Sequence, residues 1–297
     1  MLTPFASAQF PAPVPIETTI RQLGSLEQKE ITESSGIALS TRNQNVLWTH
    51  NDSGDTARIF AFDLTGKHLG EFLIKDTSFV DAEDIVAYEH EGKHRLLIGD
   101  FGDNRSKRKS ARLYVVKEPK LDDVDPGTPE TLKVIRNIKY RYENGPQNCE
   151  SIGIDASTRT LYFVEKNQLI FNDHVASFYK MDWPKKDKAD IPIAKAIGTM
   201  SYPSGVAGNP GGVPFMTTAA DMSRDGKRFV VSTYSVAYEY VRSEGQSWEE
   251  AFKQAPRRMN MPLRRQGESI CYSADGTSFY LTSEHQPSPL WEVEPKD

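Results

Sequence analysis

The stretch Asp81-Ala82-Glu83-Asp84-Ile85-Val86-Ala87-Tyr88 places three carboxylates directly before an apolar, strand-like segment. Four related stretches occur elsewhere in the 297-residue chain, each with polar residues running into an apolar one. They are Glu33–Ile37, Asn148–Ile152, Thr218–Met222 and Gln266–Ile270. Internal repetition at intervals of roughly 50–70 residues is typical of repeat architectures.

Each repeat continues in a similar way. A polar turn follows, such as Asp225-Gly226 or Asp275-Gly276 between two apolar runs, which is a strong hairpin pattern. A second strand then ends in polar residues, and a third and a weaker fourth strand follow. The fifth repeat runs out of chain after its third strand, and Ile16–Leu23 near the N-terminus is the candidate to replace the fourth.

Repeats of four antiparallel strands, with no convincing long amphipathic helix, predict an all-β fold. We expect a five-bladed β-propeller whose ring is closed by an N-terminal strand. A six-bladed ring with one degenerate blade is the alternative, and a pair of β-sandwiches is a more distant one. Helix-like stretches such as Ser247–Gln254 are interpreted as insertions.

The expected organisation is one propeller domain over residues 15–297, preceded by residues 1–14. This lead-in is expected to be flexible or the remnant of a signal peptide. Ala6-Ser7-Ala8 fits the small-x-small cleavage pattern, but the basic and apolar segments that precede such a site are missing. We therefore predict a periplasmic or secreted protein, with the cytoplasm as the alternative.

Composition restricts the partners. The net charge of −5 argues against a general nucleic-acid or anionic-membrane binder. No run of about 18 apolar residues occurs, so no membrane span is expected. The two cysteines, Cys149 and Cys271, are expected to be buried free thiols. We expect a monomer whose ligand is a small anionic molecule or a carbohydrate.

The repeats also predict a metal site. Two residues before the apolar position stand Ser35, Glu83, Glu150, Ala220 and Glu268. The first strand of every propeller blade lines the central channel, so these side chains should face one another. Three carboxylates this close repel unless they hold protons or a cation.

An oxygen-only set favours Ca²⁺, with Mg²⁺ or Mn²⁺ as alternatives. The predicted ligands are Ser35, Glu83, Glu150 and Glu268. The competing interpretation is that these carboxylates bind backbone amides and are purely structural.

This order of residues resembles that of the calcium-activated nucleotidases, the apyrase family of five-bladed propellers. The resemblance implies a Ca²⁺ held in the central channel by Glu and Ser residues, one set per blade. Ala220 falls where that family carries a Ser ligand. The segments W-T-H-N-D-S-G-D, G-D-F-G-D-N-R and A-D-M-S-R-D-G-K-R also resemble a bacterial propeller family of unsettled activity.

Polar residues at the ends of the second strands should surround the channel mouth. The candidate catalytic residues are His50, Asp52, Asp100, Lys166 and His285. Asp52 or Asp100 would orient or deprotonate a water, and the other three would assist the leaving group. The candidate substrate-binding residues are Asn51, Asn104, Arg105, Glu165, Tyr234, Arg265 and Glu284.

Two functions remain open from the sequence. The first is a Ca²⁺-dependent hydrolase of a small anionic substrate, either a phosphoanhydride or phosphoester, or a lactone or ester. The second is a non-catalytic propeller that binds a sugar, peptide or protein partner, with a structural metal or none. Turn chemistry alone would also explain Asn51–Asp55. No serine-nucleophile elbow, phosphate-binding loop or zinc-protease motif is present.

Overall fold

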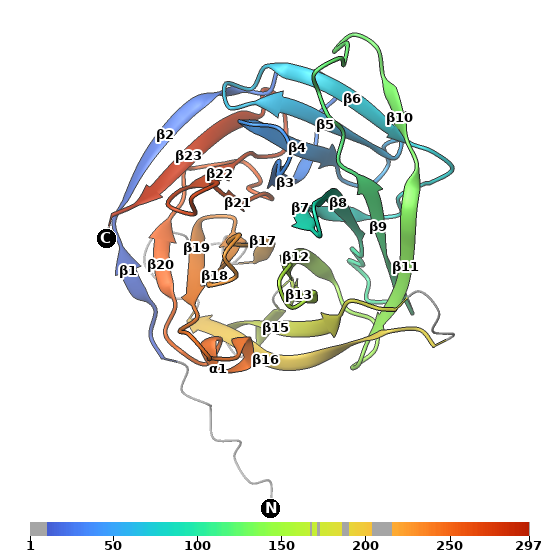
Figure 1. Ribbon diagram of the computed structural model, residues 1–297. Helices are drawn as coiled ribbons and strands as arrows, with labels where there is room; N and C mark the ends of the chain where they lie inside the picture. Colours follow the sequence, from blue (N-terminus) through green and yellow to red (C-terminus); the bar gives the residue numbers. More distant parts are fainter. Residues whose placement is uncertain (1–10, 167, 171–172, 186–189, 204–215, 297) are drawn as a thin grey trace, which may run out of the picture.

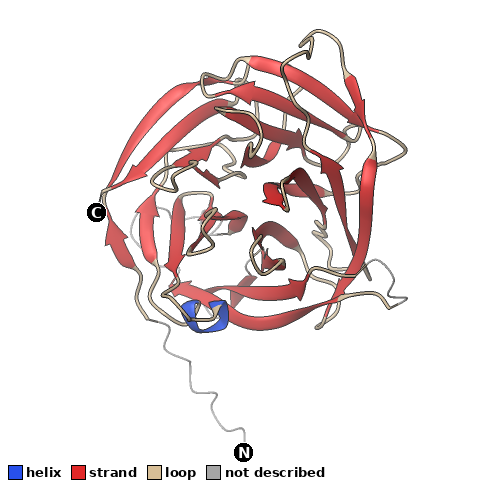
Figure 2. Cartoon of the chain, in the orientation of Figure 1, coloured by secondary structure: helices blue, strands red, loops and turns tan. Residues whose placement is uncertain are grey.

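The computed structural model describes residues 11–166, 168–170, 173–185, 190–203 and 216–296. Within these residues the chain is built of strands arranged as a ring around a central axis (Figures 1 and 2). The strands fall into consecutive antiparallel groups, which we call strand sets 1 to 5 in chain order. In each set the first strand lies nearest the axis, and the later strands lie progressively further out.

The bounds of the strands are as follows. Set 1 comprises β3 (Ser34–Leu39), β4 (Val46–Asn51), β5 (Arg58–Asp63) and β6 (His68–Ile74). Set 2 comprises β7 (Ala82–His90), β8 (Lys93–Asp100), β9 (Ala111–Lys117) and β11 (Val134–Tyr142). Set 3 comprises β12 (Cys149–Asp155), β13 (Thr160–Glu165), β15 (Asp173–Asp182) and β16 (Ile193–Pro203). Set 4 comprises β17 (Thr217–Met222), β18 (Arg228–Thr233), β19 (Val236–Val241) and β20 (Arg257–Asn260). Set 5 comprises β21 (Cys271–Tyr272), β22 (Phe279–Leu281), β23 (Pro289–Pro295) and β2 (Thr18–Ser25).

Short additional strands extend the outer edges. β10 (Glu130–Leu132) pairs in parallel with β6, and β14 (Gln168–Ile170) pairs with β15. β1 (Val14–Ile16) pairs in parallel with β20. β11 also pairs in parallel with β16, so sets 2 and 3 share one continuous sheet.

The N-terminal segment completes the last set. β2 pairs antiparallel with β23 along most of its length. The segment expected to supply this strand, Ile16–Leu23, is divided between the end of β1 and β2. β1 begins at Val14, inside the expected lead-in, and residues 1–10 lie outside the described residues. Two segments far apart in sequence therefore lie side by side at the outside of the ring (Figure 1).

The innermost strands contact one another in the order β3, β7, β12, β17, β21 and back to β3. Sheets arranged radially around an axis in this way make a β-propeller. The chain is therefore an all-β propeller, as the repeats predict. None of its described helices is long and apolar enough to cross a membrane.

The core lies between neighbouring strand sets. Buried apolar residues form clusters, each shared by two adjacent sets around the ring. Between sets 2 and 3, Phe101 and Tyr140 pack on Phe163 with ring centroids 6.1 and 4.9 Å away. Each interface buries aromatic and branched side chains, and this burial is the main force that holds the ring together. Cys149 and Cys271 are buried free thiols, as expected.

The predicted insertion Ser247–Gln254 contains helix α1 (Trp248–Ala251). Ser247 and Glu250 form a reciprocal capping box at its N-terminus. The segment also contributes to the core, because the ring of Phe252 stacks on that of Phe178 with centroids 4.1 Å apart. The insertion therefore fills space between sets 3 and 4.

Two aspartates, Asp84 and Asp221, join neighbouring inner strands. Asp84 of β7 accepts hydrogen bonds from the backbone N–H of Ile85 and of Ile152 in β12, both at 2.9 Å. Asp221 of β17 accepts in the same way from Met222, at 2.8 Å, and from Tyr272 of β21, at 2.9 Å. These carboxylates satisfy backbone donors of neighbouring inner strands.

Gly36 provides a stability test of the inner ring. Its φ is +72°, and a Cβ there would lie 2.8 Å from both Asp84 Cα and Ile85 N. Gly36→Ala should therefore lower the free energy of unfolding by about 1–2 kcal/mol because of the positive φ. The clash should lower it by about 1–3 kcal/mol more. Gly54 is the matched control, because its φ is +85° but no atom lies within 4 Å of the added Cβ. Urea unfolding measures the free energy of unfolding of both variants. If both variants lost the same amount of stability, the close approach of β7 to Gly36 in β3 would be contradicted.

Candidate functional site at the channel mouth

A β-bulge positions the first two acidic side chains. In β7, Ala82 pairs with Asp100 and Asp84 with Gly99, so Glu83 is an extra, unpaired residue. In β12 the same irregularity leaves Glu150 unpaired. A bulge bends the strand and redirects the side chain of the extra residue. Both glutamates therefore occupy equivalent places at one end of the ring, beside the last residues of the second strands.

In set 4, the position equivalent to Glu83 and Glu150 lies two residues earlier than the comparison of the repeats predicted. Thr217 pairs with Thr233 and Ala219 with Ser232, so Thr218 is the bulge residue of β17. Ala220 instead pairs with Val231 further along the strand. The alignment matched Met222 to the isoleucines of the other repeats, whereas the pairing matches Ala220 to them. A hydroxyl residue, Thr218, thus stands at the position assigned to Ala220.

The two hydroxyl residues of this ring bind neighbouring backbone. Ser35 Oγ donates to the carbonyl oxygen of Glu83 at 2.8 Å, and Thr218 Oγ1 donates to that of Gly267 at 2.7 Å. Both side chains are buried. Each hydroxyl therefore joins two adjacent strand sets, set 1 to set 2 and set 4 to set 5.

The carboxylates at this end form what we call the acidic cluster. Its members are Asp52, Asp81, Glu83, Glu150, Glu268 and Glu284. Among the described residues, carboxylate oxygens of Asp52, Glu268 and Glu284 lie within 4.8 Å of one another, and so do those of Asp52, Asp81 and Glu83. Asp52 belongs to both groups and links them.

The cluster is largely withdrawn from water. Glu83, Glu150, Glu268 and Glu284 are between 2% and 7% exposed, whereas Asp52 is partly exposed. Burial and the neighbouring charge of Glu150 raise the pKa of Glu83 well above its usual range. Burial also raises the pKa of Glu150 to about 7, although Lys166 opposes the shift.

The pKa values of Glu284 and Asp52, on the other side of the cluster, are raised as well. Burial, a hydrogen bond with Glu268 and the charge of Glu268 raise the pKa of Glu284 to about 9. Burial and the charge of Asp81 raise the pKa of Asp52 to about 6. Such shifts mean that fully ionised carboxylates are unfavourable here without a counter-charge. The arrangement can hold shared protons or a cation.

Lys166 and Tyr234 border the cluster. Lys166 Nζ lies 3.2 Å from Glu150 Oε1, and its side chain is 13% exposed. Burial disfavours its charge, but Glu150 and the neighbouring acidic groups outweigh burial and raise its pKa. Tyr234 donates its hydroxyl to Glu268 Oε1 at 2.8 Å. Lys166 Nζ lies 6.0 Å from the centre of the Tyr234 ring.

Gly102 allows the loop after β8 to approach the cluster. A Cβ at this residue would collide with Glu83 Oε1 and lie 2.6 Å from Asp81 Oδ2. The Gly102 N–H donates to the Asp81 carbonyl oxygen at 3.1 Å. Neither Asp81 nor Gly102 was a sequence candidate. The i, i+2 spacing of Asp81 and Glu83 could have indicated that Asp81 belongs to the site, because alternate residues of an extended segment face the same way.

Asp100 is held by its own loop. Its Oδ1 accepts from Arg108 Nη2 at 2.9 Å and from the backbone N–H of Asp81 at 3.1 Å. Oδ2 is buried and has no hydrogen-bond partner among the described residues. Of the basic run that contains Arg105, Arg108 is therefore the residue that reaches the interior. Arg105 itself is exposed in the loop.

The hydrogen bonds of the two candidate histidines go to residues outside the acidic cluster. His50 is fully buried, and its Nδ1 lies 2.8 Å from the Asn51 carbonyl oxygen, to which it donates. Burial lowers its pKa to about 4, so the ring is neutral at physiological pH. His285 is exposed, and its Nε2 lies 2.9 Å from Gln266 Oε1.

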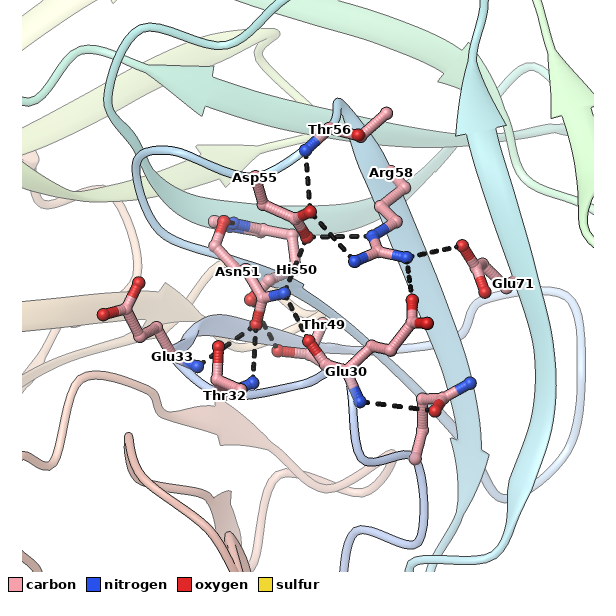
Figure 3. Close-up of polar contacts among 11 residues, drawn as sticks. Glu30, Thr32, Glu33, Thr49, His50, Asn51, Asp55, Thr56, Arg58 and Glu71 are labelled. Carbon is pink, nitrogen blue, oxygen red and sulfur yellow. Dashed lines mark hydrogen bonds and ion pairs between the residues drawn. The ribbon is translucent and has the colours of Figure 1, made fainter.

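Asn51 is the centre of a hydrogen-bond network with Glu30 and Asp55 (Figure 3). Its side-chain N–H groups donate to the Glu30 carbonyl oxygen at 2.7 Å and to Asp55 Oδ2 at 2.6 Å. Asp55 is held in turn by two bonds of 2.9 Å from Arg58. Asn51 therefore fixes the backbone directly before Asp52.

The remaining candidates are spread around the rim. Glu165 is buried at the end of β13, where it accepts from the Ser177 N–H at 3.3 Å. Asn104 is exposed and its Oδ1 accepts from Asn148 at 3.3 Å. Arg265 is exposed, whereas its neighbour Arg264 donates to the carbonyl oxygens of Ser269 and Thr282 at 3.2 and 3.0 Å.

The comparisons with known proteins give no family. No protein-family model and no curated protein matches the chain. Among solved structures, the chain is similar to the WD40 domain of Neurospora crassa Pan2, with 7% sequence identity and a TM-score of 0.35. The alignment covers 91% of this chain and 65% of that one. The assignment to the propeller fold rests on the strand pairing described above.

The raised pKa values predict the pH dependence of stability. A carboxyl group with a higher pKa in the folded chain stabilises it below the unfolded value and loses that contribution as pH rises through the folded value. In EDTA, stability should therefore fall between about pH 5 and pH 9, the range between the ordinary pKa and that of Glu284.

Glu284→Gln should reduce this fall, because glutamine keeps the shape of the protonated acid and cannot ionise. The effect should be on the order of 2 kcal/mol at the upper end of the range. Glu294→Gln, on the exposed face of β23, is the control. Urea unfolding at several pH values provides the measurement, and a Glu284 variant with the wild-type pH profile would contradict the proton-holding role.

Proposed function

We propose that the acidic cluster is a Ca²⁺ site at the mouth of a five-bladed propeller. The observation that carries the proposal is the grouping of five carboxylates in two triplets that share Asp52. Among the described residues, Lys166 is the one cationic side chain in ion-pair contact with a member of the cluster, and its partner is the sixth carboxylate, Glu150. A divalent cation would relieve the repulsion that the raised pKa values of these groups express.

The five strand sets are proposed as the five blades. Each has four antiparallel strands, and the fifth obtains its outer strand from the N-terminal β2. This arrangement supports closure of the ring by strands from opposite ends of the chain, which leaves set 5 without an exposed outer edge at β23.

The donor chemistry fits Ca²⁺. Both triplets consist of carboxylate oxygens alone, the ligands that hard cations prefer, and Ca²⁺ tolerates irregular geometry. Mg²⁺ or Mn²⁺ is the alternative. The proposed ligands now centre on Asp52, with Glu268 and Glu284 on one side and Asp81 and Glu83 on the other. From the earlier set, Glu150 is the partner of Lys166 and Ser35 binds backbone.

Hydrolysis of a small anionic substrate is the activity that we propose for this site. A bound Ca²⁺ would supply charge stabilisation for a developing oxyanion. Asp52 is partly exposed and would orient a water beside the bound ion. Lys166 and Tyr234 are the partly exposed groups that would orient an anion beside it.

The substrate class is a phosphoanhydride or phosphoester, or a lactone or ester, as the sequence suggests. A periplasmic or secreted location is proposed with it. The non-catalytic alternative is favoured by one observation, the pairing of Lys166 with Glu150, because this ion pair already neutralises part of the cluster. Under that alternative the propeller binds a sugar, peptide or protein on its face.

Calcium titration tests the site. Ca²⁺ that binds only the folded protein should raise the free energy of unfolding by about 2.7 kcal/mol at a concentration one hundred times its dissociation constant. Asp52→Asn should remove most of this gain, because Asp52 belongs to both carboxylate triplets. Glu83→Ala with Glu150→Ala should do the same.

The control is Asp275→Asn, in the hairpin turn between β21 and β22, which should respond to Ca²⁺ like the wild type. Thermal melting with Ca²⁺, Mg²⁺ and EDTA gives the readout. A wild-type protein that melts identically in all three would refute the metal site.

Turnover should be tested with a panel of nucleotides, phosphomonoesters and lactones, with Ca²⁺ or EDTA. For an accepted substrate, Asp52→Asn should lower kcat/KM by about 100-fold or more. Lys166→Met should mainly raise KM for an anionic substrate. Calcium binding without turnover of any compound would favour the non-catalytic alternative.

A further inference from the structure

A hollow lies at the opposite end of the inner strands from the acidic cluster. It has a volume of about 830 Å³ and is formed where sets 2 and 3 meet. We call it the Trp183 groove, after the indole on its wall, and its defining residues are Tyr88, Arg95, Arg136, Arg159 and Trp183. Tyr88 lies five residues after Glu83 on β7, about 17 Å along an extended strand. The groove is therefore separate from the acidic cluster.

Aromatic and cationic side chains are combined on its wall. The rings of Trp183 and Tyr88 have centroids 5.6 Å apart. The guanidinium carbons of Arg136 and Arg159 lie 5.5 and 5.7 Å from the centre of the Trp183 ring. Cation–π contacts of this kind hold guanidinium groups in place while their N–H groups remain available as donors.

The backbone supports the same arrangement. Arg136 Nη2 donates to the Pro184 carbonyl oxygen at 2.8 Å, and the Trp183 N–H donates to the Arg159 carbonyl oxygen at 2.8 Å. Arg136 comes from β11 and Arg159 from the turn between β12 and β13. Two strand sets thus bring their guanidinium groups to one indole.

The lining of the groove carries more positive than negative charge, because it includes Lys93, Arg95, Arg136, Arg159 and Lys185 but only Glu91 and Asp182 as carboxylates. No carboxylate of the described residues lies within ion-pair distance of Arg95, Arg136 or Arg159. Burial and the nearby charge of Arg159 hold the pKa of Arg136 below its usual range, although Tyr88 opposes the shift. In a protein of net charge −5, a cationic hollow of this kind is a local reversal of sign.

Part of the lining is apolar. Val115, Ile135, Ile154 and Ala156 contribute to it, and Ile135 is 38% exposed. Volumes of roughly 300–1,000 Å³ with apolar walls and a few convergent polar groups are typical of small-molecule sites. The groove therefore offers an apolar surface beside guanidinium groups that can donate hydrogen bonds to an anion.

We propose that the Trp183 groove binds an organic phosphate, specifically a phosphomonoester attached to a small planar apolar group. The forked N–H groups of Arg136 and Arg159 match the oxygens of a phosphate, to which arginine binds in a bidentate manner. The apolar lining takes the planar group. This site is independent of the proposed Ca²⁺ site and of any hydrolysis there.

Isothermal titration calorimetry with phenyl phosphate tests the proposal. The titration uses the full chain carrying Asp52→Asn, in EDTA, so that turnover at the channel cannot contribute heat. Phenyl phosphate should bind with a dissociation constant on the order of 1 mM or lower. Phenol should show no saturable binding, because it lacks the anion, and inorganic phosphate should bind more weakly, because it lacks the ring.

Arg136→Gln combined with Arg159→Gln should weaken phenyl phosphate binding by about tenfold or more. The single variant Arg159→Gln, at an exposed turn position, gives a second test should the double variant not fold. Arg112→Gln is the matched control, since Arg112 lies on β9, where it donates to Asn137 at 3.0 Å, and does not line the groove.

Three results would each overturn the proposal. They are the absence of saturable phenyl phosphate binding, equal affinity for phenol, and unchanged affinity in a folded arginine variant. The fluorescence of Trp183 supplies a local readout, because Trp183→Phe should remove any ligand-dependent change in emission. Persistence of that change would place the ligand elsewhere.

Discussion

Repulsion among carboxylates at one end of a buried channel is the constraint on which this structure depends. Six acidic groups lie there, and among the described residues Lys166 is the one cationic side chain that forms an ion pair with any of them. Burial makes each charge costly, and proximity makes them costly together. The opposing free energy comes from elsewhere in the ring, from the apolar clusters that fill the spaces between neighbouring strand sets.

The inner strands combine two roles that conflict chemically. Their apolar residues anchor the interfaces between sets, while their first residues carry the acidic groups. A bulge at Glu83 and at Glu150 separates the roles, because the extra residue leaves the ladder without shifting the strand that follows. Asp84 and Asp221 then tie adjacent inner strands through their backbone N–H groups. Function and architecture thus draw on the same short segments.

The same strands connect two ends of opposite electrostatic character. The acidic cluster lies where β7 and β12 begin, and the cationic Trp183 groove lies near their far ends. A rigid sheet between them keeps these charges apart and prevents their mutual neutralisation. A chain of modest net charge can therefore offer one surface suited to cations and another suited to anions.

The sequence by itself determined the repeated strands, the all-β propeller, the free buried thiols and the end of the ring at which acidic residues gather, because all of these follow from local patterns. Only the tertiary structure decided which carboxylates meet. Asp81, directly before β7, meets Asp52 from set 1, and Thr218 replaces Ala220 through the pairing of β17 with β18. It also decided that His50 is buried and neutral. Bulge position, loop approach and burial arise from contacts between residues distant in sequence, which a one-residue change of register alters completely.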